Sequence, residues 1–166
     1  MDNVSLSKIL RKLIGPFFGK VFSKNELIRF SNKKFYVYNT AQKPKPGHFV
    51  ALYICHPNIF VFDSLGNEHF PSNIFGNSKK VIYVNKKQIQ SNFSSICSIY
   101  VIYFIWSIYK KMSLKKIFSI FSDDRDQNDT YMFQWYMKNR LFRNYKQVSI
   151  IDSKLIHNTI KKLCSK

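Results

Sequence analysis

Residues 48–63 read HFVALYICHPNIFVFD and decide the fold. Two short segments rich in aromatic and β-branched residues, 48–55 and 58–63, flank His56 and Pro57. This pattern predicts a β-hairpin that is closed by a tight turn. Because both faces of the first segment are apolar, we expect it to be a central strand of a larger sheet.

The hairpin also predicts a chemical pairing at its open end. If the turn is centred between Cys55 and His56, His48 lies directly opposite Asp63, and apolar residues face one another along the ladder. Directly opposed residues have Cβ atoms roughly 4.5–5.5 Å apart. The carboxylate then accepts a hydrogen bond from one imidazole nitrogen, which fixes the tautomer and leaves the other nitrogen as a base. An ordinary cross-strand polar pair is the alternative interpretation.

Outward from the hairpin, hydrophobic periodicity predicts an α+β domain. We expect a central sheet of four or five strands with helices at both ends of the chain. The very apolar segment 96–109 is too short to span a bilayer and is expected to be a buried helix. The stretch 123–129, DDRDQND, is expected to be a solvated polar break. The expected helices cover residues 4–14, 95–112, 114–121, 130–141 and 153–163, and the expected further strands cover 34–39 and 79–84.

The composition is that of one globular domain. The chain has 166 residues, 45% of them apolar, with 16 Phe and 10 Tyr, and this excludes a disordered chain. Three cysteines without paired spacing argue against a disulfide framework and for a reducing compartment. The N-terminal stretch is a poor secretory signal, and no contact with a membrane is expected.

Basic residues outnumber acidic ones by 27 to 9, and the formal charge of +18 predicts a polyanionic partner. Most of the excess lies outside the hairpin, with 8 basic residues in 1–35 and 13 in 110–166. Two clusters are suited to tracking a phosphate backbone without reading bases. A solvated basic surface that results from AT-rich coding is the alternative. The cluster residues are Lys110, Lys111, Lys115, Lys116, Lys138, Arg140, Arg143 and Lys146.

Cys97 is the candidate nucleophile. It stands at the start of the apolar helix, after Ser94 and Ser95, which are candidate caps. A cysteine in the first turn of a helix meets the positive end of the helix dipole and unpaired N–H groups, and both favour the thiolate. A small core residue is the alternative for a lone cysteine.

Gln90 lies seven residues before Cys97, in the segment QSNFSSIC. A loop of this length can fold back so that the side-chain amide lies beside the sulfur. Together with the backbone N–H of Cys97, the amide would form an oxyanion hole. Taken alone, a glutamine in a polar loop indicates nothing.

The other histidines and cysteines carry no expected chemistry. His56 and His69 lie in turn-rich stretches, and His157 lies on the last expected helix. Cys55 ends a strand, and Cys164 is close to the C-terminal residue. No spacing of histidines and cysteines fits a zinc site, and the acidic stretch lacks the closing Glu of a calcium loop, so we expect no metal.

The order His48, Asp63, Gln90, Cys97 resembles that of the adenovirus-type cysteine endopeptidases, the adenains. It is also similar to their relatives in virophages and Maverick/Polinton elements, a group that shares its chemistry with the SUMO-specific proteases. The resemblance is strongest over residues 14–110. It is carried by the segments IGPFFGKVF (14–22), YNTAQKPKPGHFVALYI (38–54), FDSLG (62–66) and IQSNFSSICSIY (89–100).

The resemblance implies a papain-like cysteine protease fold of the adenain type. In that fold a central mixed or antiparallel sheet packs against a buried helix that carries the nucleophile at its N-terminus. Residues 1–166 would form a single protease domain, with C-terminal helices in 113–166. Phe49 stands where the family usually has Trp, Ser98 where Gly usually follows the nucleophile, and Asp63 where adenain itself has Glu.

The resemblance also implies the role of each residue in the site. His48 is the base, Asp63 orients it, Gln90 is the oxyanion donor and Cys97 is the nucleophile. The expected function is a viral thiol endopeptidase that cleaves capsid or core precursor proteins during virion maturation, next to small residues such as Gly. A deconjugase of SUMO or ubiquitin-like proteins is one alternative. A catalytically silent, basic nucleic-acid-binding structural protein is another.

The expected partners follow from the same resemblance. Viral capsid and core precursors are the substrates, and DNA is bound without sequence preference. No cofactor is required for the chemistry itself, and activation by DNA, by a viral peptide or by both is expected. We expect a monomer that acts in the virion and at assembly sites in the host nucleus or cytoplasm.

Overall fold

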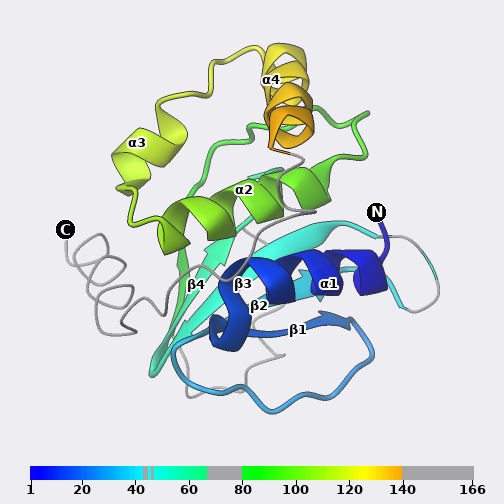
Figure 1. Ribbon diagram of the computed structural model, residues 1–166, viewed down its shortest axis with the longest axis vertical. Coiled ribbons are helices and arrows are strands. Elements are labelled where there is room, and N and C mark those ends of the chain that lie inside the picture. Colours follow the sequence, from blue (N-terminus) through cyan, green and yellow to red (C-terminus); the bar gives the residue numbers. More distant parts are fainter. Residues whose placement is uncertain (43–44, 46, 67–79, 140–166) are drawn as a thin grey trace.

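A computed structural model describes residues 1–42, 45, 47–66 and 80–139 of the chain. These residues form an α+β fold with a five-stranded mixed sheet and four α-helices (Figure 1). The strands are β1 (Phe18–Ser23), β2 (Lys34–Asn39), β3 (Phe49–Cys55), β4 (Asn58–Phe62) and β5 (Lys80–Tyr83). The helices are α1 (Asn3–Ile14), α2 (Cys97–Tyr109), α3 (Leu114–Phe118) and α4 (Arg125–Lys138), with a short 3-10 helix η1 (Gly15–Phe17) after α1.

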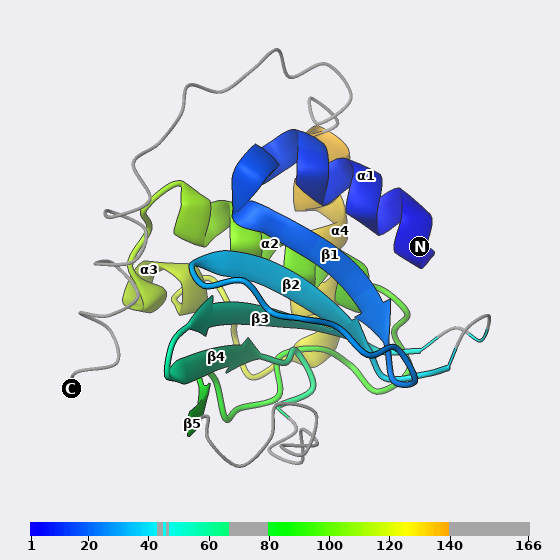
Figure 2. The same cartoon turned by 90° about the horizontal axis from the view of Figure 1, so that it is seen from below.

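The strands follow one another across the sheet in chain order, from β1 to β5 (Figure 2). β2, β3 and β4 are antiparallel neighbours, while β1 pairs with β2 and β5 pairs with β4 in parallel. β3 is the middle strand, and every one of its residues is buried. The prediction of a central strand in the segment 48–55 is therefore confirmed.

Helix α2 lies across one face of the sheet, with α1 beside it and with α3 and α4 on its outer side (Figure 1). All residues of α2 except Trp106 are buried, as its apolar sequence predicts. In the described part of the chain, no helix has both the length and the apolar character that crossing a bilayer requires.

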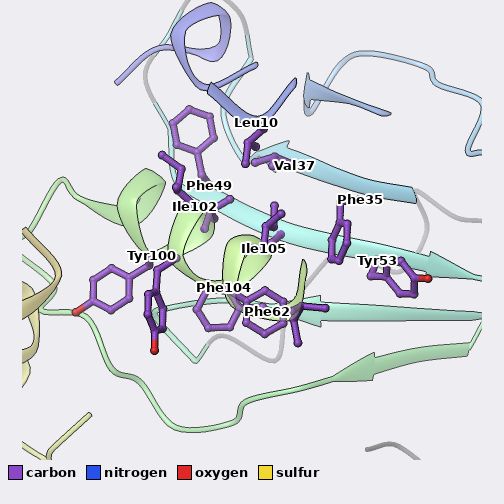
Figure 3. Packing of buried hydrophobic residues seen from close by; sticks show 14 of the residues in the cluster. Leu10, Phe35, Val37, Phe49, Tyr53, Phe62, Tyr100, Ile102, Phe104 and Ile105 are labelled. Carbon is purple, nitrogen blue, oxygen red and sulfur yellow. The ribbon is translucent and has the colours of Figure 1, made fainter. Parts of the chain in front are cut away.

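The main core lies between α2 and the sheet and combines aliphatic with many aromatic side chains (Figure 3). Phe104 of α2 stacks on Phe62 of β4 with ring centroids 4.3 Å apart, and Phe35 of β2 packs against Tyr53 of β3 at 4.7 Å. Buried aromatic side chains contribute large apolar areas and prefer defined ring geometries. The stack of Phe62 on Phe104 holds the end of β4 against the middle of α2.

The register of the hairpin differs from the one predicted. Cys55 pairs with Asn58 and Leu52 pairs with Val61, so the turn is centred between His56 and Pro57. The pairing is therefore shifted by two residues. Since side chains alternate with a period of two, a shift of two leaves every side chain on the face that was expected.

Two expectations about helix ends are wrong. The stretch 123–129 is not a polar break, because the side chain of Asp124 accepts a hydrogen bond from the N–H of Gln127 and caps α4, which begins at Arg125. Neither Ser94 nor Ser95 caps α2, whose N-cap residue is Ile96 and has no side-chain cap bond. The helix expected over 153–163 lies outside the described residues.

Candidate active site

His48 and Asp63 lie just beyond the paired ends of β3 and β4 and are joined by a hydrogen bond. His48 Nε2 and Asp63 Oδ1 are 2.6 Å apart, and both side chains are largely buried. In the observed register the two residues are diagonal neighbours, which long side chains can still bridge. The sequence therefore predicted the contact correctly from an incorrect register.

The backbone of Asp63 is held by Asn85, a residue in the loop after β5. The Asn85 amide donates to the carbonyl oxygen of Asp63 at 2.6 Å, and its Oδ1 accepts from the N–H of Asp63 at 3.2 Å. The N–H of Leu65 donates to Asp63 Oδ1 at 2.9 Å, which closes a turn around the carboxylate. The sequence does not single out Asn85, because nothing in its neighbourhood distinguishes it from an ordinary loop residue.

His48 is positioned by the end of β2. The N–H of His48 donates to the Thr40 hydroxyl at 3.0 Å, and the N–H of Thr40 donates to the His48 carbonyl at 2.9 Å. Gly47, the residue before the histidine, lies so close to Asn39 and Ala41 that a Cβ atom there would overlap both of them. Only glycine permits this close approach of the two chain segments.

Cys97 is the first residue of α2 and is 7% exposed. Burial opposes ionisation of the thiol. The hydrogen bond and the charge of His48, together with backbone hydrogen bonds at Phe49 and Ser98, nevertheless lower the pKa of Cys97 below its ordinary value. Ser98 thus contributes its backbone at the position where the adenain family usually has Gly.

His48 shows the complementary shift. Burial alone would lower the pKa of the imidazole, but hydrogen bonds to Asp63 and Cys97 raise it to about 9. Asp63 contacts Nε2, so Nδ1 is the nitrogen that remains for the sulfur of Cys97. Carboxylate, imidazole and thiol therefore form one line, in which the thiolate and imidazolium forms stabilise each other.

Gln90 lies in the loop between β5 and α2 and is 1% exposed. Its Oε1 accepts a hydrogen bond from the Ser64 hydroxyl at 2.6 Å, and its Nε2 donates to the carbonyl oxygen of Ser94 at 2.9 Å. The structure therefore brings His48, Asp63 and Cys97 into contact, whereas the side chain of Gln90 is anchored to two serines. One N–H of its amide is not used in these bonds.

Helix α4 holds the loop that carries Gln90. Asn128, which is buried, donates to the carbonyl oxygen of Ile89 at 3.1 Å. Asp129 accepts from the Tyr100 hydroxyl at 2.8 Å and from the N–H of Ser91 at 3.3 Å. The acidic stretch that precedes and begins α4 was expected to be solvated, yet its last two residues support the candidate site.

The expected nucleic-acid-binding residues are described only in part. Four of them, Lys110, Lys111, Lys115 and Lys116, are exposed around the junction of α2 and α3, and Lys138 is exposed at the end of α4. The other three, Arg140, Arg143 and Lys146, lie outside the described residues. No contact in the described part of the chain tests a role in DNA binding for any of them.

The other histidine and cysteine in the described part of the chain, His56 and Cys55, do not join the site. His56 is exposed at the hairpin turn, and Cys55 is a buried cysteine at the end of β3. His69, His157 and Cys164 lie outside the described residues. Over the described ranges, no group of three or more His, Cys, Asp or Glu side chains is placed to hold a metal ion.

No protein-family model matches the chain, and no curated protein matches it. The chemical interpretation of the site therefore depends on its own geometry. In that geometry the imidazole of His48 is hydrogen-bonded to the carboxylate of Asp63 and to the thiol of Cys97. The thiol lies at the N-terminus of a buried helix.

Proposed function

We propose that this chain is a cysteine endopeptidase with a papain-like fold of the adenain type, formed by residues 1–166 as a single protease domain. The observation that supports it is the hydrogen-bonded line from Asp63 through His48 to Cys97. The pKa of the histidine is raised and that of the cysteine is lowered, which is the pattern an ion-paired nucleophile requires.

In the proposed mechanism the Cys97 thiolate attacks the carbonyl carbon of the scissile peptide bond. The His48 imidazolium donates its proton to the leaving amine, and the resulting neutral imidazole then takes a proton from the water that hydrolyses the acyl-enzyme. Asp63 holds the ring through Nε2, so that Nδ1 faces the reacting atoms. Cys97 is regenerated as the thiolate.

The oxyanion of the tetrahedral intermediate needs hydrogen-bond donors near the sulfur. We assign this role to the Gln90 amide and to the backbone N–H of Cys97 at the start of α2. The burial of Gln90 and its two anchoring hydrogen bonds support the assignment, since a fixed donor stabilises a developing charge without reorganisation.

The proposed substrates are capsid and core precursor proteins of a DNA virus or virus-like element, cut next to small residues such as Gly. The proposed location is the virion, or assembly sites in the host nucleus or cytoplasm, and the proposed form is a monomer. Non-specific DNA binding by the exposed lysines and activation by DNA, a viral peptide or both belong to the same proposal. The proposed substrates, location and DNA binding depend on the resemblance of the sequence to the adenain family and on the formal charge of +18.

The decisive experiment incubates the purified chain with capsid precursors encoded in the same genome and maps new termini by mass spectrometry. Cleavage that is lost in Cys97→Ala and retained in Cys55→Ala is the expected result, since Cys55 is also a buried cysteine but lies at the opposite end of β3 from His48. A parallel arm with SUMO and ubiquitin-like precursors tests the deconjugase alternative. Intact precursors after prolonged incubation, with and without DNA, would favour a silent nucleic-acid-binding protein.

A further inference from the structure

Ser64 lies between the two halves of the candidate active site. It follows Asp63 directly, at the end of β4, and it is 1% exposed. Its hydroxyl donates to Gln90 Oε1 at 2.6 Å. Two consecutive residues after β4 therefore hold the site: Asp63 binds His48, and Ser64 binds Gln90.

The orientation of the Gln90 amide decides whether it can stabilise an oxyanion, because only its NH₂ end donates hydrogen bonds. The Ser94 carbonyl accepts from that end at 2.9 Å, and a carbonyl oxygen cannot donate to the other end. The other end must then be Oε1, and a buried acceptor requires a donor. The Ser64 hydroxyl is that donor. The two serines together therefore fix the positions of Oε1 and Nε2 in the Gln90 amide.

The main chain of Ser64 holds the same residue. The Ser64 carbonyl oxygen accepts from the N–H of Ile89 at 2.9 Å and from the N–H of Gln90 at 3.0 Å. Gln90 is thus tied to Ser64 at its backbone and at its side-chain oxygen. These bonds leave one N–H of the amide for a ligand.

We propose that Ser64 is a positioning residue that orients the Gln90 amide for oxyanion binding, an inference that rests on the proposed protease function. Without the hydroxyl, Gln90 Oε1 is a buried acceptor without a partner, and the amide rotates away from the orientation it has now. Ser64 itself does not touch the substrate. Its effect is therefore transmitted entirely through Gln90.

The test is a double-mutant cycle on cleavage of the precursor. Ser64→Ala is expected to lower kcat by about tenfold to a hundredfold with little change in KM, and by no more than Gln90→Ala does. In the Gln90→Ala background, the further change Ser64→Ala is expected to have no effect, because the residue that Ser64 orients is gone. Losses that multiply in the double variant, or a loss confined to KM, would overturn the proposal.

Two controls separate positioning from folding. Ser107→Ala removes another buried hydroxyl, about 15 Å along α2 from Cys97, and is expected to leave kcat unchanged. The pH profile of Cys97 alkylation is also expected to stay the same in Ser64→Ala, since the His48–Cys97 pair does not involve Gln90. If Ser64→Ala fails to fold, Ser64→Cys keeps the size with a weaker donor, and an intermediate loss of kcat is expected.

A measurement without substrate keeps the proposal independent of proteolysis. In nuclear magnetic resonance spectra, the two side-chain N–H signals of Gln90, assigned by their loss in Gln90→Ala, are expected to be well separated and slow to exchange with water. Ser64→Ala is expected to collapse this separation. Unchanged signals would overturn the positioning role even if no precursor is cleaved, whereas a collapse in a chain without protease activity would reject the protease function alone.

Discussion

His48 and Asp63 lie diagonally across the open end of the β3–β4 hairpin, with His48 Nε2 and Asp63 Oδ1 2.6 Å apart. The same oxygen also accepts from the N–H of Leu65 at 2.9 Å. The carboxylate is therefore fixed by the chain that follows it and not by the histidine alone. This rigidity lets it select one tautomer of the imidazole.

Replacing Asp63 with asparagine keeps the shape of the side chain and removes its charge. The amide of the variant can turn its NH₂ toward the ring and so favour the wrong tautomer, and it no longer stabilises the imidazolium. We expect Asp63→Asn to lower kcat by up to about 10⁴-fold with little change in thermal stability. Steady-state kinetics and thermal unfolding of the same sample measure the two effects, and near wild-type turnover would show that Asp63 is only a structural neighbour.

Asn85 offers a test of how firmly Asp63 must be held. Asn85→Ala removes both amide bonds to the backbone of Asp63. We expect the free energy of unfolding to fall by about 1–3 kcal/mol, and kcat to fall less than in Asp63→Asn. Denaturant unfolding measures the first quantity. Asn92→Ala, in the following loop, is the control for loss of an asparagine, and an equal loss of stability there would remove the special role of Asn85.

The shifted pKa values of Cys97 and His48 predict a bell-shaped dependence of activity on pH. As pH rises through the lowered pKa of Cys97 the thiolate forms, and as pH rises further through about 9 the imidazolium loses the proton that the leaving amine needs. Brief iodoacetamide treatment followed by mass mapping is expected to label Cys97 at a lower pH than an ordinary thiol requires. Cys164 is expected to react more slowly.

Two outcomes of the alkylation experiment are informative. In His48→Ala the partner that lowers the pKa of Cys97 is lost while its burial remains, so labelling is expected to require a much higher pH. Preferential labelling of Cys55 or Cys164 in the unmodified chain would contradict the assignment of Cys97 as the nucleophile.

Gln90→Ala tests the proposed oxyanion donor directly. We expect kcat to fall roughly 10²- to 10³-fold with little change in KM, because the oxyanion exists mainly in the transition state. The rate of alkylation of Cys97 serves as the control and is expected to stay constant. A variant that is weakened only in KM would indicate that Gln90 binds the substrate instead.

Secondary-structure elements with a strong hydrophobic pattern could be predicted from the sequence. The strand register could not, because it is set by contacts between elements. Segments 34–39 and 48–55 are rich in aromatic and β-branched residues, and they contain β2 and β3 as expected. The register failed because turn geometry sets the pairing, and side-chain pattern alone accepts any shift of two residues. Strand β1 is not among the strands predicted from the sequence, since its FGKVFS sequence has weak alternation.

The residues of the candidate site likewise fall into those that the sequence predicted and those that it did not. His48, Asp63 and Cys97 were candidates because each stands at the end of a recognisable element, and the resemblance of their order to that of the adenains joined them into one predicted site. Asn85 and Asn128 were not, because an asparagine that binds distant backbone has the same local sequence as one in a solvated loop. Their roles depend on contacts 22 and 39 residues away in the chain.

The exposed lysines around the α2–α3 junction allow a sharp test of DNA binding. Lys110, Lys111, Lys115 and Lys116 are all solvent-exposed, so they can approach a phosphate backbone without a change in fold. Each phosphate that is neutralised on duplex DNA releases condensed counterions and steepens the salt dependence by about 0.9 in the log–log slope. We expect binding without sequence preference that weakens steeply as salt rises.

Titration of labelled duplexes of unrelated sequence at several salt concentrations measures this slope. Replacing the four junction lysines with Gln is expected to reduce the slope by up to about 4 and to abolish any acceleration of precursor cleavage by DNA. Replacing Lys8, Arg11, Lys20 and Lys24 with Gln removes the same charge from the N-terminal part of the chain, so an equal reduction there would mean that only the net charge of +18 matters. No binding at low salt, or a flat salt dependence, would leave the basic composition as a coding bias and the chain as a protease that works without DNA.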